Sequence, residues 1–376
     1  MVATAPPPRP PAQPGPPRVV REVLPNGLTL VVRADPQVPV VAMRAIWLGG
    51  ARLERPTDAG VTSLLAAAMV RGCGARDAAA TTAEVERLAG SLGSVASRNS
   101  LALRSEWMSA HWRDGFALMA DCMLAPRFAR AEVSALRTAQ LERVAADALL
   151  PANVAFRLFV ETLYPTHPYR LPALGTPGSL RRVTATTVRA HFAAHYPAAG
   201  ATLVIVGDVD PDEVLALART RFAAASAAPA VEVVAPPSAP PSGAREVYQF
   251  VDGAQATVVI GFPGTTTTAG DRAALELLTQ HLGGQSGQLL PVLRDRLGLA
   301  YQVSVYSADG VDPGYLAIYV ACAASNVDAV VAAVRAELTA LRTRGVSIAE
   351  LDRARRRLVG AHHRAMQRRT AIANAI

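Results

Sequence analysis

The stretch "VVAMRAIWLGGARLERPTDAGVTSLLAAAMVRG" (residues 40–72) contains the order of elements on which the rest of the chain is built. Its first nine residues alternate like a half-buried strand, and Ala59–Arg71 has the length and apolar content of a buried helix. A strand followed by a helix occurs again at 256–262 ("ATVVIGF") and 271–283 ("DRAALELLTQHLG"). This recurrence is typical of two related domains in one chain.

The segments around this stretch extend the pattern through the first half. "LTLVVRA" (28–34) reads as a strand, a second helix is predicted at Thr82–Leu92, and "SLALRSEWM" (100–108) reads as another strand. An amphipathic helix is predicted at 112–124, and the half ends with the strand "ATLVIVGDV" (201–209).

The second half repeats this order. It begins with the predicted strand "REVYQFV" (245–251), and the predicted strands at 300–308 and 314–323 precede a helix at 326–345. We therefore predict an α+β fold of two homologous domains, each a mostly antiparallel sheet with helices packed on one face. The second half has no counterpart of 201–209, so we expect its domain to be shortened at the C-terminus.

Two low-complexity stretches mark the predicted domain boundaries. Residues 1–19 are rich in Pro and lack the apolar core of a signal peptide, so we expect a disordered arm. Residues 223–244 are dominated by Ala, Pro and Ser, and Pro continues neither a helix nor a central strand. The prediction is a first domain at 20–222, a linker at 223–244 and an incomplete second domain at 245–376.

The composition excludes several classes of function. The 376 residues are 51% hydrophobic, and no apolar run approaches the ~18 residues of a membrane-spanning helix. The net charge of +8 comes from Arg alone, because the sequence has no Lys, and the arginines are scattered among few aromatic residues. A nucleic-acid surface needs basic residues gathered on one face, so we expect no nucleic-acid partner.

The cysteines give a weak indication of the compartment. Cys73, Cys122 and Cys322 lie far apart, which predicts neither a disulfide framework nor a zinc finger. This pattern favours the cytoplasm. The periplasm would be the compartment if a signal peptide had been removed.

Four segments together carry a family likeness: "LPNGLTLVV" (24–32), "LGGARLERPTDAGVTSLL" (48–65), the run from "HPYRLPALGTPGSL" to "ATLVIVGDVDP" (167–211), and "LLTQHLGGQSGQLLPVLRDRLGLAYQV" (277–303). In this order they resemble the M16 (pitrilysin or insulinase-like) metallopeptidase family, from about Val20 to the end of the chain. The resemblance implies the duplicated fold predicted above.

Catalytic members of that family carry an H-x-x-E-H motif on the helix after the first two strands. Two His on one helix face hold Zn²⁺, and the Glu between them acts as general base on the bound water. Laid on this sequence, the first His, the Glu and the second His fall on Ser63, Ala66 and Ala67. The resemblance places a third, downstream ligand at Glu142, and one carboxylate cannot hold zinc. We expect no metal, no catalytic residue and no activity of the chain on its own.

Of two other family features, one is absent from this sequence and one is present. The segment "GSVASRNSLAL" (93–103) lacks the N-A-x-T pattern of the substrate-facing edge strand. In contrast, "LRDRLGLAY" keeps Arg294 and Tyr301, seven residues apart, which the resemblance assigns to substrate contact. Their donors suit a substrate carbonyl or its oxyanion. The alternative is that Arg294 forms a surface ion pair and Tyr301 is a core aromatic residue.

Other candidate sites are interpreted as structural. His191 and His195 stand at i and i+4 without an acidic residue between them, and His362 and His363 are adjacent and point apart on a helix. His167 lies in the loop "THPY", and "GGQSG" (283–287) lacks the Lys of a phosphate-binding loop and reads as a helix-ending turn.

The main hypothesis is a non-catalytic, substrate-binding subunit of a heterodimeric zinc endopeptidase. A catalytic M16 homologue would supply zinc, and this chain would close the peptide-binding chamber and contribute Arg294 and Tyr301. One alternative is a structural or scaffold homologue with no role in proteolysis. Another is an independent enzyme whose chemistry has moved elsewhere in the chain.

Overall fold

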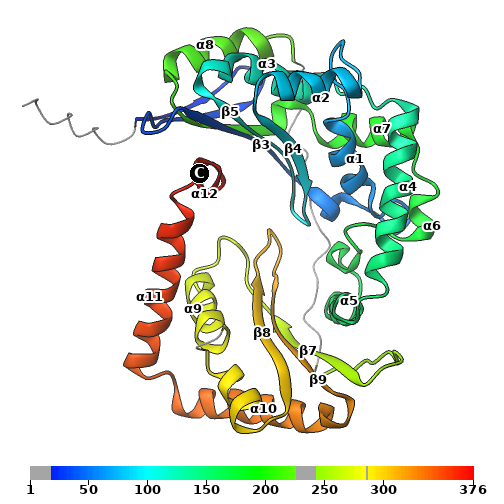
Figure 1. Cartoon of the computed structure of the whole chain (residues 1–376), viewed down its shortest axis with the longest axis vertical. Coiled ribbons are helices and arrows are strands. Elements are labelled where there is room, and N and C mark those ends of the chain that lie inside the picture. The colour runs from blue at the N-terminus through cyan, green and yellow to red at the C-terminus, as the bar shows by residue number, and fades with distance from the viewer. Residues whose placement is uncertain (1–17, 226–242, 285–286) are drawn as a thin grey trace, which may run out of the picture.

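The computed structural model describes residues 18–225, 243–284 and 287–376. Most of the predicted arm (1–19) and of the predicted linker (223–244) lies outside these described residues. The fold is α+β, with two sheets and helices around them (Figure 1). Among the helices of the described ranges, none combines the length and the hydropathy needed to span a membrane.

A six-stranded sheet forms the centre of the first domain. Its strand order is β1-β2-β6-β3-β5-β4, and every neighbouring pair is antiparallel except β2 and β6. The parallel pair arises because β6 comes last in this domain and inserts between β2 and β3. The strands are β1 (Val19–Val23), β2 (Thr29–Ala34), β3 (Val40–Leu48), β4 (Ser91–Ala96), β5 (Ser100–Met108) and β6 (Ala201–Gly207).

Helices α1, α3 and α8 pack on one face of this sheet. Alternate strand residues, such as Met43 and Trp47 on β3 and Trp107 on β5, fill the core between sheet and helices. Gly90 and Gly115 lack a side chain because a Cβ at either position would lie 2.1 or 2.5 Å from the Trp107 ring. The helical elements are η1 (Gly50–Leu53), α1 (Val61–Met69), α2 (Ala78–Arg87), η2 (Ser109–His111), α3 (Trp112–Leu124), α4 (Arg130–Asp147), α5 (Pro151–Leu163), η3 (Pro168–Arg170), α6 (Pro177–Leu180), α7 (Ala185–His195), η4 (Ala198–Gly200) and α8 (Pro211–Phe222).

The second domain contains a three-stranded antiparallel sheet in the order β7-β9-β8. Its core side packs against α9, η5 and α10, with Leu282, Leu293 and Val330 among the fully buried residues. The elements are β7 (Gln255–Pro263), α9 (Arg272–Leu282), η5 (Pro291–Arg296), β8 (Ala300–Ala308), β9 (Tyr315–Ala323), η6 (Ala324–Asn326), α10 (Val327–Arg344), α11 (Ile348–Ala365) and α12 (Arg369–Ala375).

The order of elements confirms the predicted duplication. The series β3, α1, α2, β4, β5, α3, α4, α5 corresponds to the series β7, α9, η5, β8, β9, α10, α11, α12. The sheet order β3-β5-β4 likewise corresponds to β7-β9-β8. Both domains therefore fold by one pattern, as the recurrence of strand and helix in the sequence predicts.

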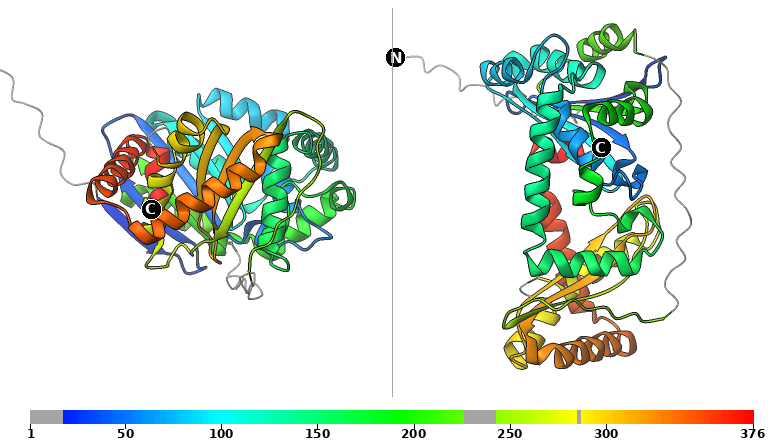
Figure 2. Two further views of the ribbon diagram at one scale, coloured as in Figure 1. Left: turned by 90° about the horizontal axis from the view of Figure 1, so that it is seen from below. Right: turned by 90° about the vertical axis from the view of Figure 1, so that its right-hand side faces the viewer.

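The last helix of each series lies on the sheet of the other domain, and the chain crosses between the domains through α4 and α11 (Figures 1 and 2). On the second sheet, Phe156 of α5 stacks on Tyr319 with ring centroids 6.2 Å apart. Phe159 meets the edge of Tyr315 and covers Gly261, where a Cβ would lie 2.2 Å from its ring. The aromatic residues of α5 thus bury a face that the second domain's own helices leave uncovered.

The first sheet receives α12 in the same way. Ile372 and Ala373 of α12 are buried against Val31 of β2 and against Val204 and Val206 of β6. At the start of this helix, Arg369 Nη2 donates to Asp35 Oδ1 at 2.8 Å, and both side chains are largely buried. We call this side of the first sheet its inner face, because it is turned toward the second domain (Figure 1).

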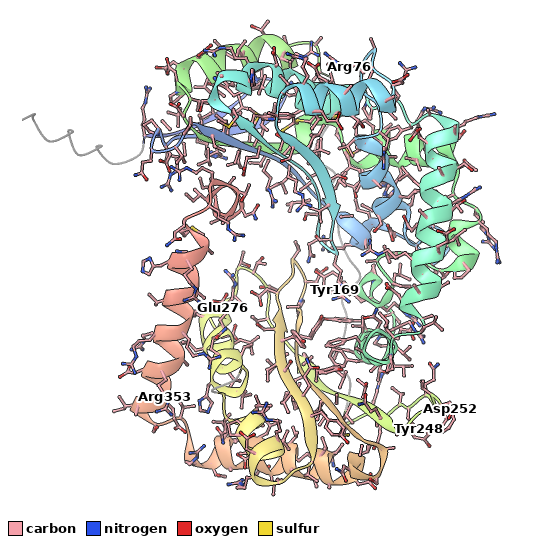
Figure 3. The ribbon with its side chains drawn as sticks, in the orientation of Figure 1. Arg76, Tyr169, Tyr248, Asp252, Glu276 and Arg353 are labelled. Carbon is pink, nitrogen blue, oxygen red and sulfur yellow. The ribbon has the colours of Figure 1, made fainter. Side chains whose placement is uncertain are left out.

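The β8–β9 hairpin forms a further contact between the domains. Arg52 of η1 pairs with Asp312 through two contacts, one of them Nη2 to Oδ1 at 3.0 Å, and the Arg52 side chain is only 8% exposed. His167 Nδ1 accepts a hydrogen bond from the Tyr169 N–H, so Nε2 carries the proton and donates to Asp312 Oδ2 at 3.0 Å. The Tyr169 hydroxyl, between the two domains in Figure 3, donates to Asn99. We call these five residues the hairpin contact.

The predicted helix at Thr82–Leu92 has the wrong bounds. The Asp77 side chain accepts from Ala80 N–H at 2.8 Å, so α2 begins at Ala78. Ala89 adopts φ 48°, which a helix does not tolerate, and β4 begins at Ser91. The periodicity of apolar residues does not reveal the Asp77 cap at the start of the helix or the positive φ of Ala89 after its end.

The predicted strand at 245–251 is also wrong. The segment forms no strand, and Tyr248, at the periphery of the second domain in Figure 3, is 91% exposed. In the first domain the corresponding strand, β2, pairs with β1 and β6 and not with β3. The described part of the second domain contains no counterpart of β1 or β6, so this segment has no strand to pair with.

We expect Asp312→Ala to lower the free energy of unfolding by about 2–4 kcal/mol, because it leaves Arg52 buried without its carboxylate. Urea denaturation of the full chain measures this loss. Asp212→Ala, which removes an exposed ion pair with Arg18, is the matched control and should change stability by less than about 0.5 kcal/mol. Equal effects of the two substitutions would contradict a structural role for the hairpin contact.

Candidate functional site

Helix α1 carries the three positions of the degenerate zinc motif, and two of them bond to neighbouring elements. Ser63 Oγ donates to the carbonyl oxygen of Ala173 at 2.6 Å, which ties the helix to the 171–176 loop. Ala66 is buried, and its carbonyl accepts from Ser94 Oγ of β4 at 2.6 Å. Ala67 has only a methyl group to offer. The Ser63 side chain and the Ala66 carbonyl connect α1 to its neighbours, and the three side chains provide no metal ligand beyond one hydroxyl.

The fourth position, Glu142, lies on α4 and is exposed, without a hydrogen bond among the described residues. The buried residue in this part of α4 is Gln140, whose amide donates to Gly60 O at 3.0 Å and to Leu174 O at 2.9 Å. Two residues along a helix correspond to a rotation of about 200°, so Glu142 points to a different side from Gln140. The assignment of Glu142 as the family's third ligand position stays a prediction.

The residues at these positions do not fit a zinc ion. A catalytic zinc site needs three protein ligands drawn from His, Cys, Asp or Glu, with a fourth position left for water. Ser63, Ala66 and Ala67 supply none of these groups. Within the described ranges, no cluster of three or more such side chains is arranged to hold a metal ion.

The N-terminus of α1 is held by a buried carboxylate. Glu54 accepts from the N–H groups of Gly60 and Thr62, both at 2.8 Å. Burial raises the pKa of Glu54 to about 7, although the two N–H donors act in the opposite direction. This carboxylate satisfies two of the free N–H groups at the helix start and stabilises the helix dipole. The frame of the family's catalytic helix is therefore intact, although its ligands are absent.

Two histidines of α7 lie next to this helix. His191 Nε2 lies 3.1 Å from Thr62 Oγ1, and its ring meets the edge of His195 with centroids 4.8 Å apart. Burial, together with the neighbouring His195, lowers the pKa of His191 to about 4. Burial also lowers the pKa of His195, so both rings are neutral near pH 7. His191 uses its Nε2 to bind α1. The geometry gives this pair a place in the packing of α7 against α1.

The structure places Arg294 and Tyr301 in the second domain. Arg294 lies in η5, is half-exposed and forms an ion pair with its neighbour Asp295, Nε to Oδ1 at 2.8 Å. Tyr301 lies where the register of β8 against β9 shifts between Ala300 and Gln302. Such a bulge turns a side chain out of the regular alternation, and Tyr301 is 62% exposed. The surface ion pair weighed for Arg294 is present, whereas Tyr301 is not a core residue.

The other three histidines considered in the sequence analysis lie outside the α1–α7 contact. His362 and His363 are both exposed on α11. His167 belongs to the hairpin contact, so the loop "THPY" connects the two domains, a role that its sequence did not reveal. Part of the "GGQSG" segment, residues 285–286, lies outside the described residues.

Both halves of the chain match family models. The model described as insulinase (peptidase family M16) matches residues 29–177, and the model described as peptidase M16 inactive domain matches residues 182–358. The chain belongs to the M16 peptidase family. The relatives named as uncharacterized zinc proteases include a protein of Streptomyces coelicolor, 26% identical over 95% of this chain and 79% of its own length. Another, from Rickettsia bellii, is 26% identical over 88% of this chain and 80% of its own length.

Solved structures of other bacterial proteins share the fold. A protease from Helicobacter pylori matches 95% of this chain and 88% of its own with a TM-score of 0.88 and 21% identity. A peptidase M16 inactive domain from Pseudomonas fluorescens matches 91% and 84% with a TM-score of 0.81 and 22% identity. The Streptomyces and Rickettsia relatives are named as zinc proteases. In this chain, however, Ser63, Ala66 and Ala67 do not form a set of zinc ligands.

We expect the purified chain to retain much less than one zinc per molecule after dialysis, because its motif positions carry no His, Cys, Asp or Glu. Elemental analysis beside a chelator-treated sample measures this. The triple substitution Ser63→His, Ala66→Glu and Ala67→His supplies two ligands and the base, and serves as the comparison. Stoichiometric zinc in the unaltered chain would refute the prediction.

The low pKa of His191 predicts a pH dependence of stability. The pKa of His191 in the folded protein, about 4, lies below the usual 6.5. Its contribution to the free energy of unfolding is therefore complete above pH 6.5 and is lost as the pH falls toward 4. At pH 5 the loss is roughly 1–2 kcal/mol after allowance for solvent screening. His191→Gln removes the titration, so the difference in unfolding free energy between the two proteins should shift with pH over this window.

The pH dependence that Glu54 gives to stability has the opposite sign. Because its pKa is raised, its contribution to the free energy of unfolding is complete below about pH 4.5 and is lost as the pH rises through about 7. Comparison with His191→Gln cancels the Glu54 contribution, which both proteins share. A difference that stays constant from pH 7.5 to pH 5 would contradict the buried, neutral state of His191.

Proposed function

We propose that this chain is the non-catalytic, peptide-binding subunit of a two-subunit M16 endopeptidase. A second M16 homologue with an intact H-x-x-E-H motif supplies zinc and the general base. This chain closes the peptide chamber and offers donors to the substrate. The main support for this proposal is a difference between the two domains. The first domain has no metal ligands at the motif positions Ser63, Ala66 and Ala67, whereas Arg294 and Tyr301 of the second domain are accessible.

The state of α1 supports the loss of catalysis. Ser63 has a structural hydrogen bond, Ala66 is buried, and neither position offers the imidazole or carboxylate that zinc hydrolysis requires. At the same time Glu54, Gln140 and Ser94 hold the helix in place. A preserved helix without ligands fits a subunit that keeps the chamber architecture and leaves the chemistry to its partner.

The position of Tyr301 supports a binding role for the second domain. A core aromatic residue would be buried, whereas the bulge at the start of β8 presents the Tyr301 hydroxyl to solvent. Arg294 keeps two of its three guanidinium nitrogens without a described partner, since only Nε pairs with Asp295. These groups can donate to a substrate carbonyl or to the oxyanion that forms on it. A scaffold homologue would give neither residue such a task.

We expect Arg294→Ala and Tyr301→Phe each to lower the turnover of the assembled complex by about 100-fold, the usual loss for one preorganised oxyanion donor. Loss of a ground-state contact alone would instead raise KM and leave kcat nearly unchanged. Peptide cleavage by this chain mixed with the zinc-bearing homologue gives both constants. Size-exclusion profiles and melting curves show whether assembly and stability are preserved.

Arg296→Ala is the matched control, because it removes an exposed Arg of the same segment that pairs with Glu337. It should leave turnover unchanged. If the Arg294 and Tyr301 variants assemble and cleave peptides at the unaltered rate, the scaffold function replaces this proposal.

A further inference from the structure

The inner face of the first sheet carries a row of residues that crosses all six strands. The strand register aligns them in the order Arg21, Val31, Val204, Arg44, Arg104 and Gly93. Val31 and Val204 lie under α12, as described above. The row thus brings Arg44 and Arg104 side by side on β3 and β5, although 60 positions separate them in the sequence (104 minus 44).

These two arginines have no acidic partner. Among the described residues neither guanidinium forms an ion pair or a hydrogen bond with any carboxylate, whereas several other arginines there do. Glu106 is on the same face, two residues along β5, and makes no such contact with either. Like charges directly opposite each other on neighbouring strands destabilise a sheet. The pair therefore works against the stability of the fold.

Arg44 is the less exposed of the two. It lies between Val204, which contacts α12, and Arg104, and both burial and the Arg104 guanidinium lower its pKa. Arg104 is exposed and extends across Gly93, where a Cβ would lie 3.4 Å from its Nε. Because β4 is the last strand of the sheet, the absence of a side chain at Gly93 lets Arg104 reach toward the free edge.

The next row of the same face is apolar. Ile46, Ala102 and Val95 stand beside the arginines on β3, β5 and β4, and Val95 is well exposed. We define the arginine patch as Arg44 and Arg104 with Ile46, Ala102 and Val95. It offers two cations beside the half-buried Ile46 and the exposed Val95, with the buried Ala102 between these two and no aromatic side chain among its members on which a base could stack.

We propose that the arginine patch binds acidic peptides, with Arg44 and Arg104 each receiving a carboxylate of an extended segment of the pattern Glu-x-Glu or Asp-x-Asp. Alternate residues of an extended peptide point to the same side and are about 6.8 Å apart, which the two long Arg side chains can bridge. Aliphatic residues near the carboxylates would cover Ile46 and Val95. This specificity deepens the peptide-binding role proposed above and rests on it.

Fluorescence anisotropy with the full-length purified chain tests this proposal. The probes are two labelled peptides of one length, identical except that one contains Glu-x-Glu and the other Gln-x-Gln. We expect the Glu peptide to bind about tenfold or more tightly, as for one or two charge-assisted hydrogen bonds. Added salt should reduce the difference, because it screens the charges.

The variants Arg44→Gln and Arg104→Gln should each remove most of the preference for the Glu peptide. Arg342→Gln is the matched control, since Arg342 is an exposed residue of α10 with no described partner. Arg44→Gln should also raise the melting temperature, because it relieves the repulsion, so weaker binding cannot be attributed to unfolding. Arg104→Glu places a carboxylate opposite Arg44 and should abolish the preference for the Glu peptide, because the two side chains neutralise each other.

Three results would overturn the inference. The first is equal binding of the Glu and Gln peptides, unchanged in Arg104→Gln, which leaves the subunit function itself standing. The second is no binding of either peptide, which contradicts both proposals if Arg294→Ala is also without effect on the complex. The third is tighter binding of a single-stranded oligonucleotide that Arg104→Gln abolishes, which would assign the patch to a different class of polymer.

Discussion

The exchange of helices between the two domains is the constraint on which the rest of the structure depends. Each sheet has apolar residues on a second face that its own helices do not cover, and the other domain supplies the helix that packs against them. Since burial of apolar surface is the main stabilising contribution in folding, neither domain completes its core alone. The relative position of the two sheets is therefore fixed, and Arg52 and Asp312 reinforce it at the hairpin contact.

This constraint also accounts for the firm packing of α1, although its motif positions carry no set of metal ligands. The helix lies between the sheet, α4 and α7, and Glu54, Gln140 and His191 all bond to its first turn. Loss of the helix would expose the core of the first domain, whereas loss of the metal-binding side chains leaves its packing intact. Catalysis and architecture are separable here because different residues of one helix serve them.

Local patterns of the sequence predicted the elements, and contacts between distant residues decided the rest. β5 and α3 have the predicted bounds, because their apolar periodicity reports on one buried face. Residues 245–251 have an equally strand-like pattern, but a strand requires a partner, which no local pattern reveals. His167 was assigned to local structure because its partner Asp312 is 145 positions away. The pairing of Arg44 with Arg104 depends on the strand register, which the alternation of residues does not fix across a sheet.

The register of β3 against β5, which places Arg44 opposite Arg104, is unfavourable for stability but suits the binding of an acidic ligand. A fold selected only for stability would place an apolar or acidic residue opposite Arg44, because a half-buried Arg beside a second Arg loses solvation and gains repulsion. On the second sheet the corresponding contact is stabilising, because Phe156 of α5 stacks on Tyr319. Residues that lower stability without a compensating contact in the fold are the ones expected at binding sites. The adjacent arginines therefore agree with the acidic-peptide binding that we propose for the arginine patch.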